Sequence, residues 1–170
     1  MSIDRIYREF SGFSLIILSL FIFVSLLTFS AQDNIENLLT DSKIYINNFG
    51  YLGALVSSTI LSYIGYSSYY LAIICFYFGM ILFFSSSSKN FTDRLNFINN
   101  VLFGFISIFP LTVFCVSFIN TTGTEIDLLS IGSGGIAGNN LSLILNSYMS
   151  SLLVGSLAGL LFLTFQYFIF

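Results

Sequence analysis

The sequence predicts an all-α integral membrane protein, with four transmembrane helices in a single membrane domain of residues 1–170. The chain is 56% hydrophobic and only 8% charged, and four of its apolar stretches are long enough to cross a bilayer. Soluble domains carry about a quarter charged residues, whereas a transmembrane helix needs about 20 mostly apolar residues. The expected spans are roughly Phe13 to Phe29, Ser67 to Phe84, Phe97 to Ile119 and Ser151 to Phe170.

The first apolar stretch has some features of a cleaved signal peptide, because Arg5 and Arg8 precede it and the letters FSA end it. Its apolar run is longer than the usual h-region of about 7 to 15 residues, and Phe29 is bulky where cleavage requires a small residue. We therefore interpret this stretch as a retained anchor.

The basic residues orient the four spans, because short cytoplasmic loops carry an excess of Lys and Arg. Arg5 and Arg8 precede the first span, and Lys89 and Arg94 lie between the second and the third. Only Lys43 lies in the loop after the first span. We therefore expect a multi-pass membrane protein with both termini in the cytoplasm.

A short helix is expected before the second span. The apolar run from Gly50 to Phe84 is too long for one untilted span and too short for two spans with a turn. Gly65 is the best position for a break, because the permissive backbone of glycine lets a helix end or bend. This leaves Tyr51 to Ile64, which has the length of a re-entrant or interfacial helix.

The two faces of this short helix differ in size and polarity. Large apolar residues share one face, and small or hydroxyl residues share the other, namely Ala54, Ser57, Ser58 and Ser62. Backbone at membrane depth must be shielded by protein. Re-entrant packing therefore predicts that Gly53, Ala54, Ser57 and Ser58 face neighbouring helices; the alternative is a helix that lies along the membrane surface.

The same passage occurs again 85 residues later, the interval from Gly50 to Gly135. Further corresponding pairs are Gly53 and Gly138, Ser57 and Ser142, Ile60 and Leu145, and Tyr63 and Tyr148. We infer two parallel half-repeats, about residues 1–85 and 86–170, each with a span, an outer loop, a short amphipathic helix and a second span. The alternative is a chance similarity between two helix starts rich in Gly and Ser.

Two glycine-led motifs resemble those of a known family. The stretch NNFGYLGALVSSTILSYIGYSSYYL is similar to a G-x-x-G-A pattern before the family's second span, and SGGIAGNNLSLIL resembles its S-G-G-x-x-G-x-x-L-S pattern before the fourth. The family is the N-terminal four-span membrane domain of the FtsK/SpoIIIE-type DNA translocases of bacteria, and the resemblance covers essentially the whole chain. After the first span, TFSAQDN retains the Asp of a further family pattern as Asp33 but lacks its Pro.

The resemblance implies an anchor in the bacterial inner membrane at the division septum, which acts in cell division and chromosome partition together with division proteins. It also implies a homo-oligomer, hexameric like the family's ATPase motor, which pumps chromosomal DNA through the closing septum. The motor's G-x-x-x-x-G-K-[ST] motif is absent from these 170 residues. Because the sequence stops at Phe170 within an apolar helix, we expect the reading frame to continue into a polar linker and such a motor.

Glycines are the candidate structural residues, and they are Gly50, Gly53, Gly65, Gly135 and Gly138. Gly65 is a candidate hinge between the short helix and the second span; the alternative is an ordinary glycine of a membrane helix. Ser151, Gly155 and Gly159 form a small-xxx-small stripe on the last span, where helix backbones can approach closely. Packing within one bundle is favoured over self-association for this stripe. Pro110 is expected to kink the third span.

Two acids in the outer loop NTTGTEIDLLS, Glu125 and Asp127, are candidate contacts for division proteins. Asp127 is preferred, because the family pattern also tends to carry an acid at that distance before the second glycine motif. The alternative is that both acids simply keep the loop solvated.

Composition argues against other functions. Five scattered basic residues do not make a nucleic-acid-binding surface, and a chain without His, whose Cys75 and Cys115 lie in apolar runs, suggests no metal or cofactor site. We therefore expect no enzyme activity and no cofactor in this segment. A small channel, a holin-like protein or a carrier of lipid or solute is the alternative function, although the expected spans lack the charged residues that a coupled pump usually needs.

The orientation can be tested with a topology reporter. A reporter fused near Lys89 is expected to read cytoplasmic and the same reporter near Lys43 periplasmic, because four spans place these loops on opposite sides. Paired alkaline phosphatase and fluorescent protein fusions measure this directly. A periplasmic signal near Lys89 would contradict both the four-span topology and the half-repeats.

Overall fold

Helices are the regular elements of the structure, a computed structural model that describes residues 3–33, 45–84, 91–119 and 133–169. In chain order they are α1 (Ile3–Leu27), a short 3-10 helix η1 (Ala31–Asp33), α3 (Gly50–Ile64), α4 (Ser67–Phe84), α5 (Phe91–Ile106), α6 (Ile108–Ile119), α7 (Gly135–Asn146) and α8 (Ser151–Ile169). Four segments of this part of the chain are long and apolar enough to cross a membrane: Arg5–Leu27, Ser67–Phe84, Asn96–Phe118 and Ser151–Ile169. The predicted all-α, four-span class is confirmed.

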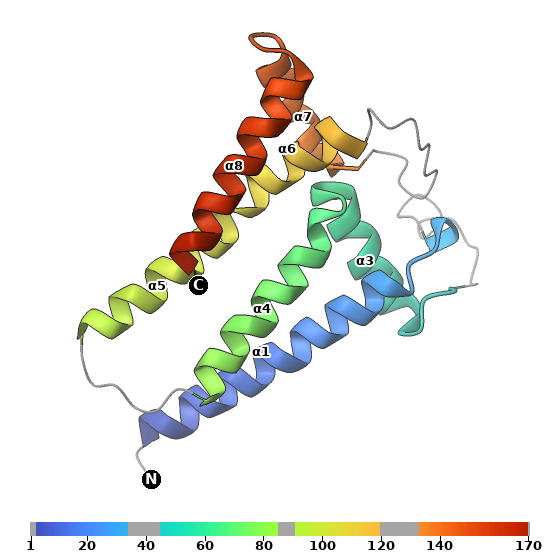
Figure 1. Ribbon diagram of the computed structural model, residues 1–170. Coiled ribbons are helices and arrows are strands. Elements are labelled where there is room, and N and C mark those ends of the chain that lie inside the picture. Colours follow the sequence, from blue (N-terminus) through green and yellow to red (C-terminus); the bar gives the residue numbers. More distant parts are fainter. Residues whose placement is uncertain (1–2, 34–44, 85–90, 120–132, 170) are drawn as a thin grey trace.

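The first two spans, α1 and α4, pack antiparallel along their length (Figure 1). Near the start of α1, a Cβ added to Gly12 would lie 2.6 Å from the backbone nitrogen of Phe83 and 2.8 Å from the carbonyl oxygen of Gly79. Near the other end, the Tyr69 hydroxyl donates a hydrogen bond to the Leu26 carbonyl at 3.1 Å. Glycine at the crossing lets the two backbones meet, which is how membrane helices associate without a hydrophobic driving force.

The third and fourth spans form a second antiparallel pair. A Cβ added to Gly155 would lie 2.6 Å from the Ser117 Cβ, and one added to Gly159 would lie 3.0 Å from the Phe114 ring. Towards the other end, the Phe103 and Phe168 rings stack with centroids 5.6 Å apart. Both glycines of the predicted stripe therefore face α6, while Ser151 is exposed at the start of α8.

The third span is interrupted where α5 ends at Ile106 and α6 begins at Ile108. Pro110 has no N–H, so the Ile106 carbonyl loses its partner four residues later, and the proline ring crowds the preceding turn. The interruption at Ser107 lies in the turn before the proline, where its effect on the helix is expected. Ser107 is fully buried there, and its hydroxyl donates to the Gly104 carbonyl at 2.7 Å.

The helix boundaries differ from the predicted spans mainly at the N-terminus. α1 begins at Ile3 rather than near Phe13, and it ends at Leu27 rather than Phe29. The extension is polar and forms an exposed i,i+4 ion pair of 2.6 Å between Arg5 and Glu9, a spacing that supports helix beyond the apolar run.

The antiparallel pairing brings the end of α1, the start of α4, the end of α6 and the start of α8 to one end of the bundle. α3 and α7 also lie there, away from the chain's N-terminus (Figure 1), and we call it the α3/α7 end. Both halves of the chain follow the same order of span, short helix and span. The division into half-repeats and the orientation stay predictions; Lys43 and Lys89, which determine the orientation, lie outside the described residues.

A glycine substitution tests the α1/α4 crossing. Gly12→Leu is expected to lower the free energy of unfolding by about 1–3 kcal/mol, because the new side chain meets backbone atoms that cannot rotate away. Ser14→Leu is the control, since Ser14 is exposed on the same helix. Unfolding in detergent micelles, followed by circular dichroism, measures both variants; equal stabilities would contradict a close crossing at Gly12.

Candidate functional site

α3 buries its small residues, and apart from the buried Leu61 its large apolar residues are partly or fully exposed. Ala54 and Ser57 are 0% exposed, and Gly53 and Ser58 are also buried. In contrast, Leu52 is 63% exposed and Tyr63 is 58% exposed. This is the burial that packing at membrane depth requires, because lipid can cover the apolar face while protein shields the polar one.

α7 presents the same positions to the protein. Its buried residues are Gly135, Gly138 and Ser142, and the last two correspond to Gly53 and Ser57 of α3. The opposite face is open, with Leu143 70% and Ile144 61% exposed.

The buried hydroxyls of both short helices are satisfied within their own helix. Ser57 donates to the Gly53 carbonyl at 2.8 Å, and Ser142 donates to the Asn139 carbonyl at 2.9 Å. Such i−4 and i−3 bonds let serine lie in an apolar environment without an external partner. The small faces can therefore pack closely without leaving these hydroxyls unpaired.

A buried polar side chain ties the start of each short helix to the preceding span. The Asn47 amide donates to the Ser25 carbonyl at 2.7 Å, and its oxygen accepts from the Phe49 N–H at 3.1 Å. In the second half, the Ser133 hydroxyl donates to the Cys115 carbonyl at 3.0 Å. Sequence reasoning did not single out either residue, although a polar residue just before each glycine motif was the available signal.

The turn between α3 and α4 meets the start of α7 backbone to backbone. Gly65 has φ 59° and ψ −141°, a conformation that glycine adopts readily and other residues do not. A Cβ added to Gly65 would collide with the Ser133 carbonyl oxygen, and one added to Gly135 would lie 2.6 Å from the Gly65 nitrogen. The Tyr66 N–H donates to the Ser133 carbonyl at 2.8 Å. We call these five residues, Gly65, Tyr66, Ser133, Gly134 and Gly135, the glycine junction.

The junction also fixes α7 on the third span. A Cβ added to Gly138 would lie 2.8 Å from the Thr112 carbonyl oxygen, and one added to Gly134 would lie 2.5 Å from the same atom.

Burial, and to a lesser extent the neighbouring Cys115, raises the pKa of the Tyr66 phenol above its ordinary value. The phenol at the junction therefore stays neutral at physiological pH.

A chain of polar side chains connects three spans near the break at Ser107. The Gln166 amide donates to the Tyr70 hydroxyl at 2.6 Å, and that hydroxyl lies 3.0 Å from the Ser107 hydroxyl. Polar bonds between helices hold membrane bundles together. A lone Gln in an otherwise apolar span was the only sequence signal, and sequence reasoning missed the chain.

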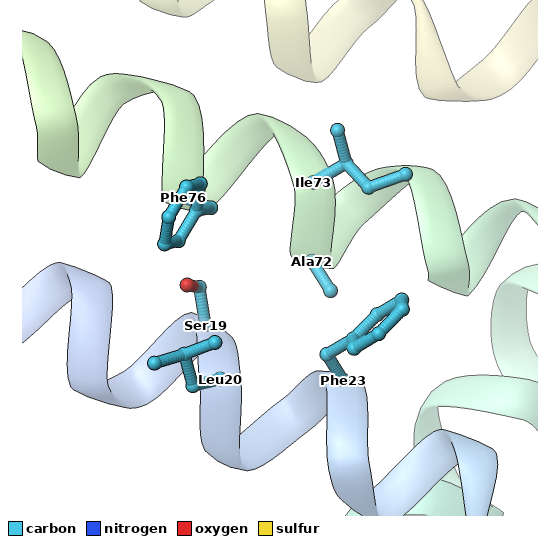
Figure 2. Close-up of a pocket in the computed structure, with 6 residues that line it drawn as sticks. All are labelled: Ser19, Leu20, Phe23, Ala72, Ile73 and Phe76. Carbon is cyan, nitrogen blue, oxygen red and sulfur yellow. The ribbon is translucent and has the colours of Figure 1, made fainter.

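Two apolar hollows lie on the flanks of the spans. Figure 2 shows the first, about 210 Å³ between α1 and α4, lined by Ser19, Leu20, Phe23, Ala72, Ile73 and Phe76. The Ser19 hydroxyl is bonded to the Ile16 carbonyl at 2.8 Å. The second, about 410 Å³, lies between α6, α7 and α8, with Val113, Leu145 and Leu157 among its apolar lining residues. Such linings fit hydrocarbon and carry no group for acid–base chemistry.

The other predicted residues divide into three groups. Gly50 has a positive φ of 59° at the start of α3, but a Cβ there would meet nothing within 4 Å. Gly53 packs against the Asn47 side chain. Glu125 and Asp127 lie outside the described residues. Within the described ranges, no group of three or more His, Cys, Asp or Glu could hold a metal ion.

The fold and the junction define a class of protein, a polytopic α-helical membrane domain whose two amphipathic helices join its spans at one end through glycine contacts. Comparison with family models identifies the particular family. The model described as the 4TM region of DNA translocase FtsK/SpoIIIE matches residues 4–170, and the chain belongs to this family. The resemblance inferred from the glycine motifs is confirmed. Comparisons with curated proteins and with solved structures gave no match.

Gly50 and Gly135 are a matched pair for testing the junction, because both begin a short helix with φ near 60°. Gly50→Ala is expected to cost about 1–2 kcal/mol, the price of left-handed backbone in a residue with a Cβ. Gly135→Ala is expected to cost about 1–3 kcal/mol more, because its Cβ also meets the backbone of the α3–α4 turn. Unfolding in detergent micelles gives both values; equal losses would mean that the junction adds no stability.

Proposed function

We propose that this segment is the membrane anchor of a DNA translocase that acts at the division septum of a bacterium, in cell division and chromosome partition. The observation that carries the proposal is membership of the FtsK/SpoIIIE 4TM family over residues 4–170. In this proposal the domain recruits the translocase through division proteins and brings copies together, while a separate cytoplasmic motor moves DNA. Both termini lie on the cytoplasmic side of the inner membrane, and the domain itself contacts no DNA and catalyses no reaction.

The physical features of the domain support an anchoring role. Its exposed surface is largely apolar, with large side chains such as Ile17, Leu20 and Leu160 about half exposed along the spans, as contact with a bilayer requires. Several polar groups, such as Asn47, Ser133 and Gln166, hold helices to one another. These features suit a domain that holds an attached protein in place rather than one that carries out a reaction.

A carrier of lipid or another apolar solute is the second candidate. The observation that favours it is the hollow of about 410 Å³ between α6, α7 and α8, a volume within the range of ligand pockets. Transfer of a fluorescent lipid between liposomes, catalysed by the purified chain, would favour this candidate over the anchor.

Fluorescence microscopy tests the anchoring function. A fluorescent fusion of the chain, expressed in the source bacterium or a related one, is expected to concentrate at the septum late in division, because recruitment by division proteins is local. Uniform membrane fluorescence throughout the division cycle would contradict septal recruitment.

Two loop variants sharpen the same experiment. Asp127→Asn is expected to reduce the septal fraction and Glu125→Gln to leave it unchanged, because Asp127 is the preferred contact for a division protein. Equal septal fractions for both variants, at equal membrane levels, would remove Asp127 from that role.

A further inference from the structure

The glycine junction is a contact between two parts that each occur twice in the chain. One part is the glycine motif just before a short helix, Asn48–Gly50 in the first half and Ser133–Gly135 in the second. The other part is the turn just after that helix. Gly65 and Tyr66 of the first turn correspond, 85 residues later, to Ser150 and Ser151. Within the chain, the second motif docks on the first turn.

Among the residues that the structure describes, the two remaining parts make no corresponding contact. A Cβ added to Gly50 would meet nothing within 4 Å, and the neighbouring Asn48 and Phe49 are exposed. At the second turn, every residue from 143 to 153 is exposed, and Tyr148 reaches 84%. The first glycine motif therefore has no turn docked on it, and the second turn has no glycine motif docked on it.

These two free parts cannot meet within one chain. In Figure 1 the start of α3 and the α7–α8 turn lie far apart, with the α3–α4 turn and the start of α7 between them. An exact two-fold relation between the halves would have produced both contacts at once. The contact is made once, and the second copies of its two surfaces lie unused at separate places. This is the arrangement of a head-to-tail interface.

We propose that the first glycine motif of one copy docks on the α7–α8 turn of a second copy of this chain. The inference rests on the self-association included in the proposed function and specifies the surfaces that would meet. The interface is heterologous, because each copy contributes a different surface, so copies form a ring if the rotation closes and a filament if it does not.

The chemistry of the free parts suits this contact. Ser151 is the first residue of α8, and its N–H has no partner within the helix, so it can donate to the Asn48 carbonyl of the next copy as Tyr66 donates to Ser133. Exposed apolar side chains lie in or next to both surfaces: Phe49 and Leu52 at the motif, Tyr148 and Leu152 at the turn. Within a membrane such surfaces can pack on each other as well as on lipid.

The contact between copies is not an exact repeat of the junction. Phe49 and Ser150 stand where the junction has Gly134 and Gly65, so the two backbones cannot approach as closely. The second turn also contains four residues between α7 and α8, 147–150, against two between α3 and α4. The contact between copies therefore combines the Ser151–Asn48 bond with side-chain packing, and it is more easily separated than the junction.

Cysteine cross-linking in native membranes tests the proposal. Asn48→Cys is placed in one tagged chain and Ser151→Cys in a second chain with a different tag, and the two are expressed together. Mild oxidation is expected to give a mixed dimer that carries both tags, because a disulfide requires Cα atoms within about 7 Å. One chain carrying both substitutions is expected to give a ladder of higher multimers.

The unsubstituted chain and the single variants are the controls for this experiment. Both substitutions are at exposed positions, and the native Cys75 and Cys115 remain in every variant. The unsubstituted chain and either single variant alone are expected to stay monomeric on oxidation. Dimers of Asn48→Cys with itself, or of Ser151→Cys with itself, would show a symmetric interface and overturn the proposal.

Photobleaching of the fluorescent chain in membrane nanodiscs separates failure of this interface from failure of self-association. Several bleaching steps without the mixed disulfide would overturn the head-to-tail contact and leave self-association in place. Single bleaching steps would overturn both. Several steps together with the mixed disulfide would support the interface.

Discussion

The backbone contact between Gly65 and Gly135 is the constraint on which the arrangement of the spans depends. In a bilayer, apolar side chains gain little by packing on one another instead of on lipid, so helices associate where small residues let their backbones approach or where polar groups bond. The glycine junction provides both, because a Cβ added to Gly135 would lie 2.6 Å from the Gly65 nitrogen and the Tyr66 N–H bonds to the Ser133 carbonyl at 2.8 Å. The pair α1 and α4 is thereby held against the pair formed by the third span and α8. A second connection between the two pairs is the chain of polar contacts from Gln166 through Tyr70 to Ser107, near the break in the third span.

The same solvent explains why α3 and α7 are built with their small and polar residues inside. A surface helix of a soluble protein buries its large apolar side chains, but here Leu52 and Leu143 are turned outward and Ser57 and Ser142 are buried. The outward face suits contact with lipid because its side chains are apolar, and the inward face packs closely because its side chains are small. Asn47 and Ser133 complete this arrangement, since each uses a buried side chain to hold a helix start on the span before it. Two helices that are too short to cross the membrane are therefore held firmly at one end of the bundle.

Sequence reasoning predicted the features that depend on length and periodicity, and it missed those that depend on tertiary pairing. The four spans follow from apolar runs, and the buried face of α3 follows from the spacing of Ala54, Ser57 and Ser58. Gly65 was predicted as the end of a helix, but its contact with Gly135, 70 residues away in the sequence, leaves no local pattern. The effect of Pro110 appears at Ser107, because a proline disturbs the turn before it. The pairing of Tyr70 with Gln166 likewise cannot be predicted from the sequence, because a hydroxyl and an amide can each bond to many partners.

The difference between Gly65 and Ser150 explains why two similar halves make one contact inside the chain and not two. Gly65 combines φ 59° with ψ −141°, so the first turn closes in two residues and presents bare backbone to the second motif. Ser150 carries a Cβ and would be strained in that conformation, and the second turn is longer and lies at the tip of the bundle (Figure 1). The first motif differs in the same sense, because Phe49 has a bulky ring where Gly134 has none. Both changes weaken the second copy of the contact, and both leave its surfaces exposed. In the proposed anchor, the closed copy of the contact holds one domain together and the open copy joins it to a neighbouring copy.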